Sequence, residues 1–234
     1  MSATYTQLLD LIDENAGTDD TSYSKASKTR DINLALDKAL ALIFQVGGTW
    51  QFDDSGHTDY PIITTDLNSG QRDYPFTTDG SGNLILEIYK VFVADSNGTF
   101  HPVYPRDVPK GAPSNYYDGL DVGGQPTTYD KLGNGIFLNP IPNYDQDDGL
   151  KIYINREALY FTTSDTTKKA GIAGLFHEYL ALRPAFQYAY RKNLPNTNRL
   201  EGEVLKMEAD IQDYYKSREK DVQKAFRGRI TNAR

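Results

Sequence analysis

The first fifty residues carry two apolar stripes with helical spacing. The first stripe follows one face of a 3.6-residue period and consists of Tyr5, Leu8, Leu9 and Ile12. Thr4 or Thr6 is suited to begin this helix, and Gly17 is suited to end it. The polar stretch 18–30 that follows is predicted to be a loop.

The second stripe predicts a longer helix. Its main positions are Ile32, Ala35, Leu36, Ala39, Ile43 and Val46. Leu40 and Leu42 widen the stripe, so we expect this helix to be buried on more than one side. Asp31 is predicted to be its N-cap, and Gly47 with Gly48 is predicted to end it.

From Trp50 to about Glu157 the pattern changes to short segments that alternate between apolar and polar positions, separated by Gly, Asn, Asp and Pro. The alternation is clear at Leu150, Ile152 and Ile154, and it is typical of half-buried strands. It also runs through Leu84, Leu86 and Ile88. The predicted strands are 60–65, 84–93, 99–104, 135–139 and 150–155. Short strands between turn residues favour an antiparallel sheet or a small sandwich over a parallel doubly wound sheet.

Helical spacing returns near Thr167. The apolar face there consists of Ile172, Leu175, Phe176, Tyr179, Leu180 and Phe186. Pro184 is expected to kink or break this segment. A last long helix is predicted from about Arg199, with a face formed by Leu200, Val204, Met207, Ile211, Tyr214 and Tyr215. The next apolar residue is Val222, and this gap indicates that the helix leaves the body of the protein after Tyr215.

These segments together predict an α+β fold. Two N-terminal and two C-terminal helices are expected to form a helical bundle into which an antiparallel β domain is inserted. The predicted division is 1–48 for the N-terminal helices, 49–160 for the β-rich insert, and 161–234 for the C-terminal helices with a basic tail.

Composition excludes several classes of function. The chain has no Cys, which excludes a disulfide framework, Cys-ligated zinc, iron–sulfur clusters and a Cys nucleophile. A net charge of −7 argues against a globally basic nucleic-acid binder. No apolar run approaches the roughly 18–20 residues that span a bilayer, and no signal peptide is visible, so we expect no membrane partner.

Candidate chemistry is sparse, because the chain has three His. His177 precedes Glu178 on a predicted helix, but position 181 is Ala and not the second His of a zinc-protease motif, so a core or interface role is favoured. His101 is interpreted as structural. His57 lies among Asp53, Asp54 and Asp59, where a polar turn is favoured over a hydrolase site.

The acidic stretch 143–149 lacks the Gly and Glu of an EF-hand, and a weak surface calcium site stays as an alternative. Gly133-Asn134-Gly135 lacks the third Gly and the following helix of a dinucleotide-binding loop. We therefore predict no catalytic residues, no cofactor and no metal.

Charge is unevenly distributed along the chain. Residues 191–234 hold 11 basic and 7 acidic residues, a net charge of +4, whereas the remaining residues carry −11. Apolar residues at four-residue steps run through the last part of this basic stretch, which favours docking over simple solvation. The predicted docking residues are Lys216, Arg218, Lys220, Val222, Lys224, Phe226, Arg227, Arg229, Ile230 and Arg234.

The order of the turns and strands resembles the head-to-tail connector (adaptor) proteins of tailed bacteriophages. The resemblance is carried by Gln125-Pro126-Thr127-Thr128-Tyr129, by Gly133-Asn134-Gly135-Ile136-Phe137-Leu138-Asn139-Pro140-Ile141-Pro142, and by Gly149-Leu150-Lys151-Ile152-Tyr153-Ile154-Asn155-Arg156. The upstream segments 6–15 and 31–48 and the downstream run 176–180 also resemble that family.

The resemblance implies a non-enzymatic structural protein of the virion. Such adaptors form homo-oligomeric rings, typically dodecamers, beneath the portal protein. They join the portal to a downstream neck or tail protein. Genomic DNA passes through the lumen without specific binding. The resemblance implies a place in the virion neck, and in the host cytoplasm during assembly, with the basic tail docking on the portal.

Two alternatives stay open. The first is a carbohydrate- or protein-binding β module of a phage tail or baseplate, in which Tyr116, Tyr117 and Tyr129 stack on sugars. The second is a hydrolase that uses His57 with a neighbouring Asp.

Overall fold

The computed structural model describes residues 2–46, 62–79, 82, 84–106, 122–132 and 135–218. The helices are α1 (Tyr5–Ala16), α2 (Lys25–Gln45), the 3₁₀ turn η2 (Gly174–Phe176), α3 (Tyr179–Lys192) and α4 (Thr197–Arg218). The strands are β1 (Ile62–Leu67), β2 (Asp73–Pro75), β3 (Ile85–Ala94), β4 (Phe100–Pro105), β5 (Thr128–Leu132), β6 (Gly135–Asn139) and β7 (Gln146–Arg156). The mixed α+β class is therefore confirmed.

Helix α1 forms as its sequence predicts. The Thr4 side chain accepts a hydrogen bond from the Gln7 backbone N–H, and the Gln7 side chain accepts one from the Thr4 N–H, which completes a capping box. The apolar residues Tyr5, Leu8 and Ile12 are fully buried. Gly17 ends the helix in the left-handed conformation with φ of 65°, which costs a residue without a β-carbon little.

Helix α2 begins earlier than predicted. Its N-cap is Ser24, whose hydroxyl accepts a hydrogen bond from the Ser27 N–H. The predicted loop 18–30 is therefore helical from residue 25, and the prediction of Asp31 as the N-cap is wrong. Asp31 lies inside the helix and is 1% exposed, because its carboxylate has partners there. The predicted stop at Gly47 and Gly48 lies outside the described residues, and α2 ends at Gln45.

The C-terminal helices also differ in part from the prediction. Residues 167–173 are not helical, and Leu175 of the predicted apolar face is 56% exposed on the turn η2. Helix α3 runs on through Pro184, so the prediction of a break there is wrong. An interior Pro costs about 3 kcal/mol. Because Pro184 is buried and α3 contacts all three other helices, packing offsets that cost.

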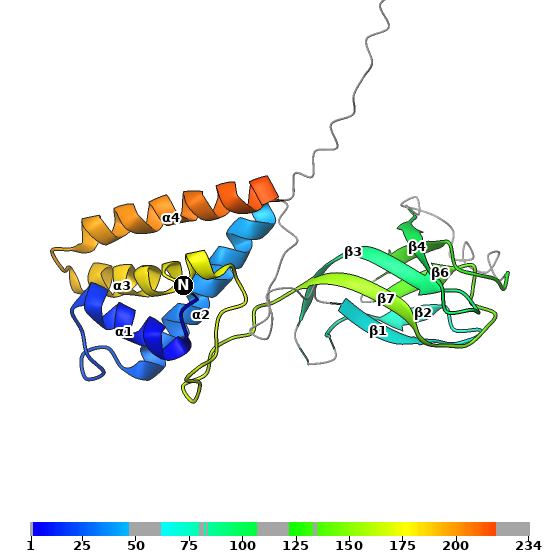
Figure 1. The fold of residues 1–234 in the computed structure, drawn as a ribbon, viewed down its shortest axis with the longest axis horizontal. Coiled ribbons are helices and arrows are strands. Elements are labelled where there is room, and N and C mark those ends of the chain that lie inside the picture. Colours follow the sequence, from blue (N-terminus) through cyan, green and yellow to red (C-terminus); the bar gives the residue numbers. More distant parts are fainter. Residues whose placement is uncertain are drawn as a thin grey trace, which may run out of the picture.

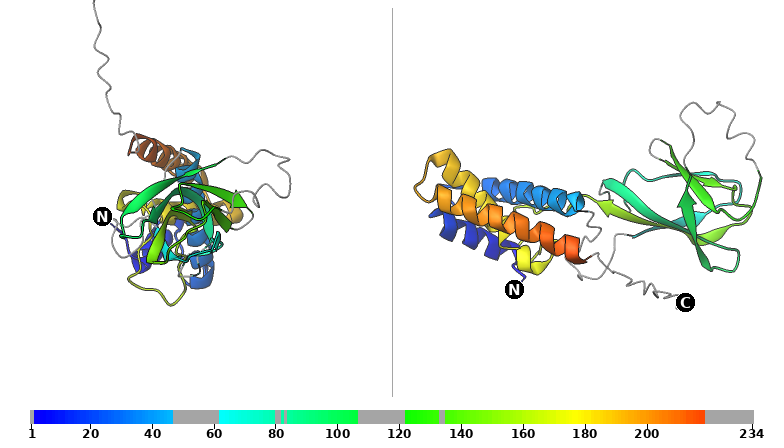
Figure 2. Two further views of the ribbon diagram at one scale, coloured as in Figure 1. Left: turned by 90° about the vertical axis from the view of Figure 1, so that its right-hand side faces the viewer. Right: turned by 90° about the horizontal axis from the view of Figure 1, so that it is seen from above.

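The seven strands of the described residues form a sheet in the order β1-β7-β3-β4-β5-β6-β2. Neighbouring strands are antiparallel except β4 and β5, which pair in parallel through Tyr104 with Thr128 and Pro105 with Tyr129. The predicted sheet is thus antiparallel in every pair but one. Residues 107–121, which stand between β4 and β5 in the sequence, lie outside the described part of the chain. Figure 2 shows that the sheet is curled.

All five predicted strands are present. Four of them, β1, β3, β4 and β6, begin and end within two residues of their predicted bounds, whereas β7 begins four residues early. Strands β2 and β5 are too short and too polar to show an alternating pattern. The predicted alternation fails at the start of β3, since Leu84 just before the strand and Leu86 within it are 45% and 51% exposed. The pairing of β3 with β7 shifts in register between Ile85 and Glu87 and again between Ile88 and Lys90. Such bulges change which side chains of the strand face the core, and Val91 and Val93 are buried.

The helices and the strands have separate cores. One buried cluster joins residues of the four helices with Phe161, Ala170 and Ile172, and the other joins residues of the strands only, such as Ile136, Leu138 and Ile152. Figure 1 shows the helices gathered at one end of the molecule and the strands at the other. The predicted boundaries at residues 48 and 160 stay predictions. No helix among the described residues is long and apolar enough to span a membrane.

Candidate functional site

The structure describes two of the three His, and the contacts of both stabilise the fold. His177 is 1% exposed, with Nδ1 3.1 Å from the Ala3 carbonyl oxygen and Nε2 3.0 Å from the Ile172 carbonyl oxygen. It therefore ties the N-terminal segment to the turn before α3, as its predicted core role requires. His57 and its three neighbouring Asp lie outside the described residues, so the hydrolase alternative is untested.

His101 faces Asp95 across the turn that joins β3 to β4. Its Nε2 lies 3.1 Å from an Asp95 carboxylate oxygen. The other carboxylate oxygen accepts hydrogen bonds from the Asn97 and Thr99 N–H groups. These backbone bonds, with the bond to His101, lower the pKa of Asp95 below its usual range. The pair closes a turn, and this agrees with the structural role predicted for His101.

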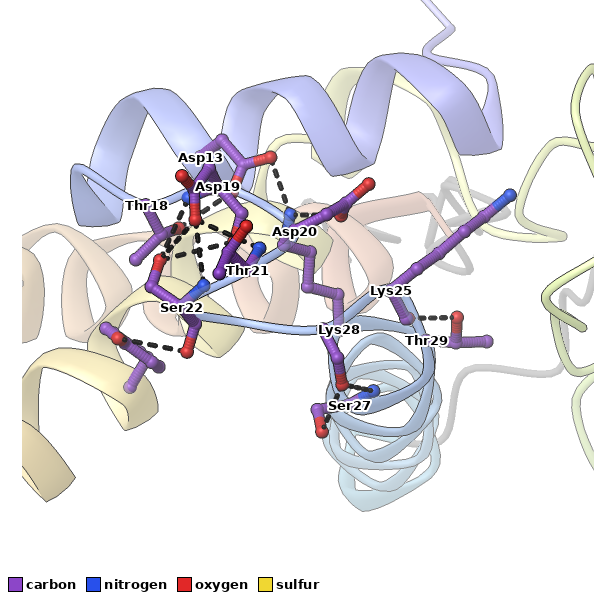
Figure 3. Close-up of polar contacts among 12 residues, drawn as sticks. Asp13, Thr18, Asp19, Asp20, Thr21, Ser22, Lys25, Ser27, Lys28 and Thr29 are labelled. Carbon is purple, nitrogen blue, oxygen red and sulfur yellow. Dashed lines mark hydrogen bonds and ion pairs between the residues drawn. The ribbon is translucent and has the colours of Figure 1, made fainter.

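The connection between α1 and α2 is organised by a buried Lys (Figure 3). Lys28 has no exposed surface, and its Nζ donates to Asp13 at 2.6 Å and to Asp20 at 2.9 Å. Burial alone lowers the pKa of Lys28, but the bonds to Asp13 and Asp20 outweigh burial and raise the pKa above its ordinary value. This lysine clip holds the end of α1 and the following loop against α2.

The loop is shaped further by Asp19. One of its carboxylate oxygens accepts from the Thr21 and Ser22 N–H groups and from the Ser22 hydroxyl, at 2.8 to 3.0 Å. The Ser22 backbone bond is the largest cause that lowers the pKa of Asp19. The carboxylates of Asp13, Asp19 and Asp20 therefore lie in the same loop region, and each accepts hydrogen bonds from groups of the protein. Among the described residues no group of His, Cys, Asp or Glu is arranged to hold a metal ion, and that includes the described stretch 143–149.

A second buried charge, Asp31, joins α2 to α3. Its carboxylate accepts from the Tyr23 hydroxyl at 2.5 Å, from the Arg30 Nε at 3.0 Å, and from Arg191 of α3. Burial alone raises the pKa of Asp31, but these three hydrogen bonds outweigh burial and lower it below its usual range. The Asp31 cluster lies beside a groove of about 460 Å³ that Arg30, Arg191 and Lys192 also line. Since both Arg are paired with Asp31, we assign no anion site there.

Among the described residues, the large exposed apolar side chains fall into two groups. The helical group lies on the helices and on the turns beside them, and consists of Leu34, Tyr160, Leu175, Tyr190 and Leu205. The strand group consists of Ile62, Leu84, Leu86, Phe100, Tyr104 and Val122. Leu34 and Tyr160 line one groove of about 540 Å³ beside α2. These side chains belong to neither buried cluster.

Of the predicted docking residues, the structure describes two. Lys216 is exposed on the last turn of α4, and Arg218 is the last residue of that helix. The other eight lie outside the described residues: Lys220, Val222, Lys224, Phe226, Arg227, Arg229, Ile230 and Arg234. Tyr129, proposed to stack on sugars, is 3% exposed, so it is a core residue and the carbohydrate alternative loses it. Tyr116 and Tyr117 are not described.

Sequence reasoning missed the lysine clip and the Asp31 cluster. A signal existed for the first, because Lys28 stands four residues before Ile32 and so extends the apolar stripe of α2 backward. No such signal existed for Arg191, which reaches Asp31 from a helix 160 residues away in the chain. No protein-family model and no curated protein matches this chain.

Proposed function

We propose that the chain is a structural adaptor of a tailed-phage virion, a non-enzymatic subunit that assembles as a ring beneath the portal protein. In this proposal four helices form a bundle and the strands form a domain inserted into it. The ring joins the portal to a downstream neck or tail protein and lets genomic DNA pass. The subunit assembles in the host cytoplasm and resides in the virion neck.

One observation supports the proposal: the two groups of exposed apolar side chains lie in two regions that have separate cores. A ring built from one kind of subunit needs two different patches, since each subunit contacts its neighbours through unlike surfaces. The helical group supplies one patch and the strand group supplies the other. The segment order that resembles connector proteins supports the same function. The predicted basic tail gives the subunit a further contact with the portal.

Complementation between two variants tests this arrangement. Leu34→Glu damages the helical group, and Leu86→Glu damages the strand group, without removing a buried side chain. Each variant alone is expected to stay monomeric. A mixture of the two is expected to form dimers and no rings, because each variant keeps the patch that the other lacks.

The matched controls are Lys206→Glu on α4 and Ser96→Glu at the β3–β4 turn, both at exposed polar positions. These controls are expected to assemble like the unchanged chain. Mass photometry reads every species in the mixtures. Rings from either damaged variant, or no dimer in the mixture, would show that these groups are not the two ring contacts.

A further inference from the structure

A groove with an apolar floor runs along the outer face of α1. It has a volume of about 460 Å³ and is lined by Ala3, Gln7, Asp10, Leu11, Glu14 and Glu178. Ala3 and Leu11 are half-buried and form the floor, whereas the three carboxylate side chains are exposed along the rim. The lining positions of α1 are three or four residues apart, so they share one side of the helix.

No described Lys, Arg or His side chain forms an ion pair with the rim carboxylates. Within the described part of the chain, Asp10, Glu14 and Glu178 enter no ion pair and no side-chain hydrogen bond, unlike the paired Asp13 of the same helix. Three like charges along one groove repel one another, and a basic segment lying in the groove relieves that repulsion. The groove therefore fits a partner that is both apolar and basic.

The end of α4 packs against the turn η2, which comes just before Glu178 of the rim. The Tyr215 hydroxyl accepts a hydrogen bond from the Ala173 N–H at 3.1 Å, and the Tyr214 ring packs on the Phe176 ring with 5.3 Å between centroids. Glu178 of the rim follows Phe176 by two residues. The last turns of α4 therefore contact the segment that leads to the rim residue Glu178.

The residues after α4 have the composition that the groove fits. Residues 219–234 contain five basic residues, Lys220, Lys224, Arg227, Arg229 and Arg234, against two acidic ones. Val222, Phe226 and Ile230 recur at four-residue steps and give an apolar side for the floor. Helix α1 is about 18 Å long, and sixteen residues reach at most about 55 Å. The segment is therefore long enough to turn back and cover the groove.

We propose that residues 219–234 dock in the α1 groove of their own chain when the subunit is free. A segment tethered beside its site has an effective concentration in the millimolar range, far above that of another copy in dilute solution. The proposal goes beyond the adaptor function and does not depend on a ring or a portal. In an adaptor, it would keep the basic tail covered until a portal competes for it.

Zero-length cross-linking of the unmodified free chain tests the contact directly. A carbodiimide joins a Lys amine to a carboxylate only where the two touch. Peptide mass spectrometry is expected to find Lys220 or Lys224 joined to Asp10, Glu14 or Glu178 within single chains, with a yield that does not change on dilution. Cross-links confined to dimers, with a yield that rises with concentration, would overturn docking in the same chain.

A charge-neutral variant provides the second measurement. Asp10→Asn, Glu14→Gln and Glu178→Gln together keep the shape of the rim and remove its charge. Each exposed ion pair is expected to strengthen docking of the tail by a small factor, and the factors of three pairs multiply. Trypsin is therefore expected to release the tail about tenfold faster from this variant than from the unchanged chain. The control variant Asp147→Asn, Glu201→Gln and Asp210→Asn removes three exposed carboxylates elsewhere and is expected to match the unchanged chain. Equal release from all three proteins would overturn the proposal.

Discussion

The helical region and the strand region are stabilised by different means. The helical core encloses charged and polar side chains, among them Lys28, Asp31 and His177, each with named partners on another segment. The strand core is an aliphatic and aromatic cluster held by backbone ladders. Its region buries fewer polar side chains, Asp130 and Asn155, and has the Arg156–Asp79 ion pair at 2.8 Å. Polar contacts between segments therefore contribute more to the arrangement of the helices, whereas backbone pairing in a fixed register arranges the strands.

The largest expected effect separates the two cores. Ile154→Ala in β7 removes a fully buried side chain and is expected to cost about 3 kcal/mol of unfolding free energy. Because the cores share no buried residue, hydrogen exchange is expected to accelerate in the strands and not in the helices. Leu36→Ala, in the core of α2, is the reciprocal control. Equal acceleration in both regions after either change would mean that they unfold as one unit.

The lysine clip gives the next effect in size. Lys28→Met leaves Asp13 and Asp20 without their cation and is expected to destabilise the helical region by about 2 kcal/mol, less than a fully buried pair because the Asp20 side chain is 72% exposed. Lys25→Met, three residues earlier on α2, is the matched control. Lys25 lies 5.6 Å from the Tyr5 ring centroid, and its loss is expected to cost less than about 1 kcal/mol. Urea titration measures both, and equal costs would contradict a special role for Lys28.

Acid is expected to act on the helical region through Asp31. Its pKa is lowered in the folded state, so the ionised carboxylate stabilises the fold at pH values above the unfolded pKa of about 3.9. That contribution is lost as the pH falls through the folded pKa. Unfolding free energy measured between pH 6 and pH 2 is expected to fall less steeply for Asp31→Asn than for the unchanged chain. The same slope for both proteins would show that Asp31 does not couple folding to protons.

The smallest effect concerns the contact between α3 and α4. The Tyr179 hydroxyl donates to Glu208 at 2.8 Å, and Arg183 donates to the same carboxylate oxygen at 2.6 Å. Tyr179→Phe removes one of these two donors and is expected to cost about 1 kcal/mol. Thermal unfolding of Tyr179→Phe beside Tyr144→Phe, which loses a hydrogen bond to the Ala94 carbonyl in the strand region, compares single hydroxyls in the two regions.

Local patterns were sufficient to predict much of the fold. The stripe of Tyr5, Leu8 and Ile12 and the alternation of Leu150, Ile152 and Ile154 are buried as expected, because each segment has one period throughout. The errors arise where contacts between residues far apart in the sequence determine the local structure. Asp is a residue type that favours the N-cap, but hydrogen bonds from Tyr23 and Arg191 stabilise Asp31 inside a helix. Leu86 has the period of a strand, but the bulges of β3 turn it outward.

The candidate surfaces were less predictable. The charges in the sequence are sufficient to predict a basic tail. The groove of α1 could not be predicted, because it depends on the fold placing Glu178 beside Asp10 and Glu14. The two exposed apolar groups likewise depend on which residues each core covers. Leu175 was expected to be buried, and Tyr129 was expected to be accessible, and the structure reverses both.

The mass of the unmodified chain in solution tests the central claim most directly. Mass photometry across a range of concentrations, alone and mixed with the portal protein of a tailed phage, is expected to show a closed species containing many copies of the 26.3 kDa chain. A chain that stays at 26.3 kDa in every mixture would contradict the account.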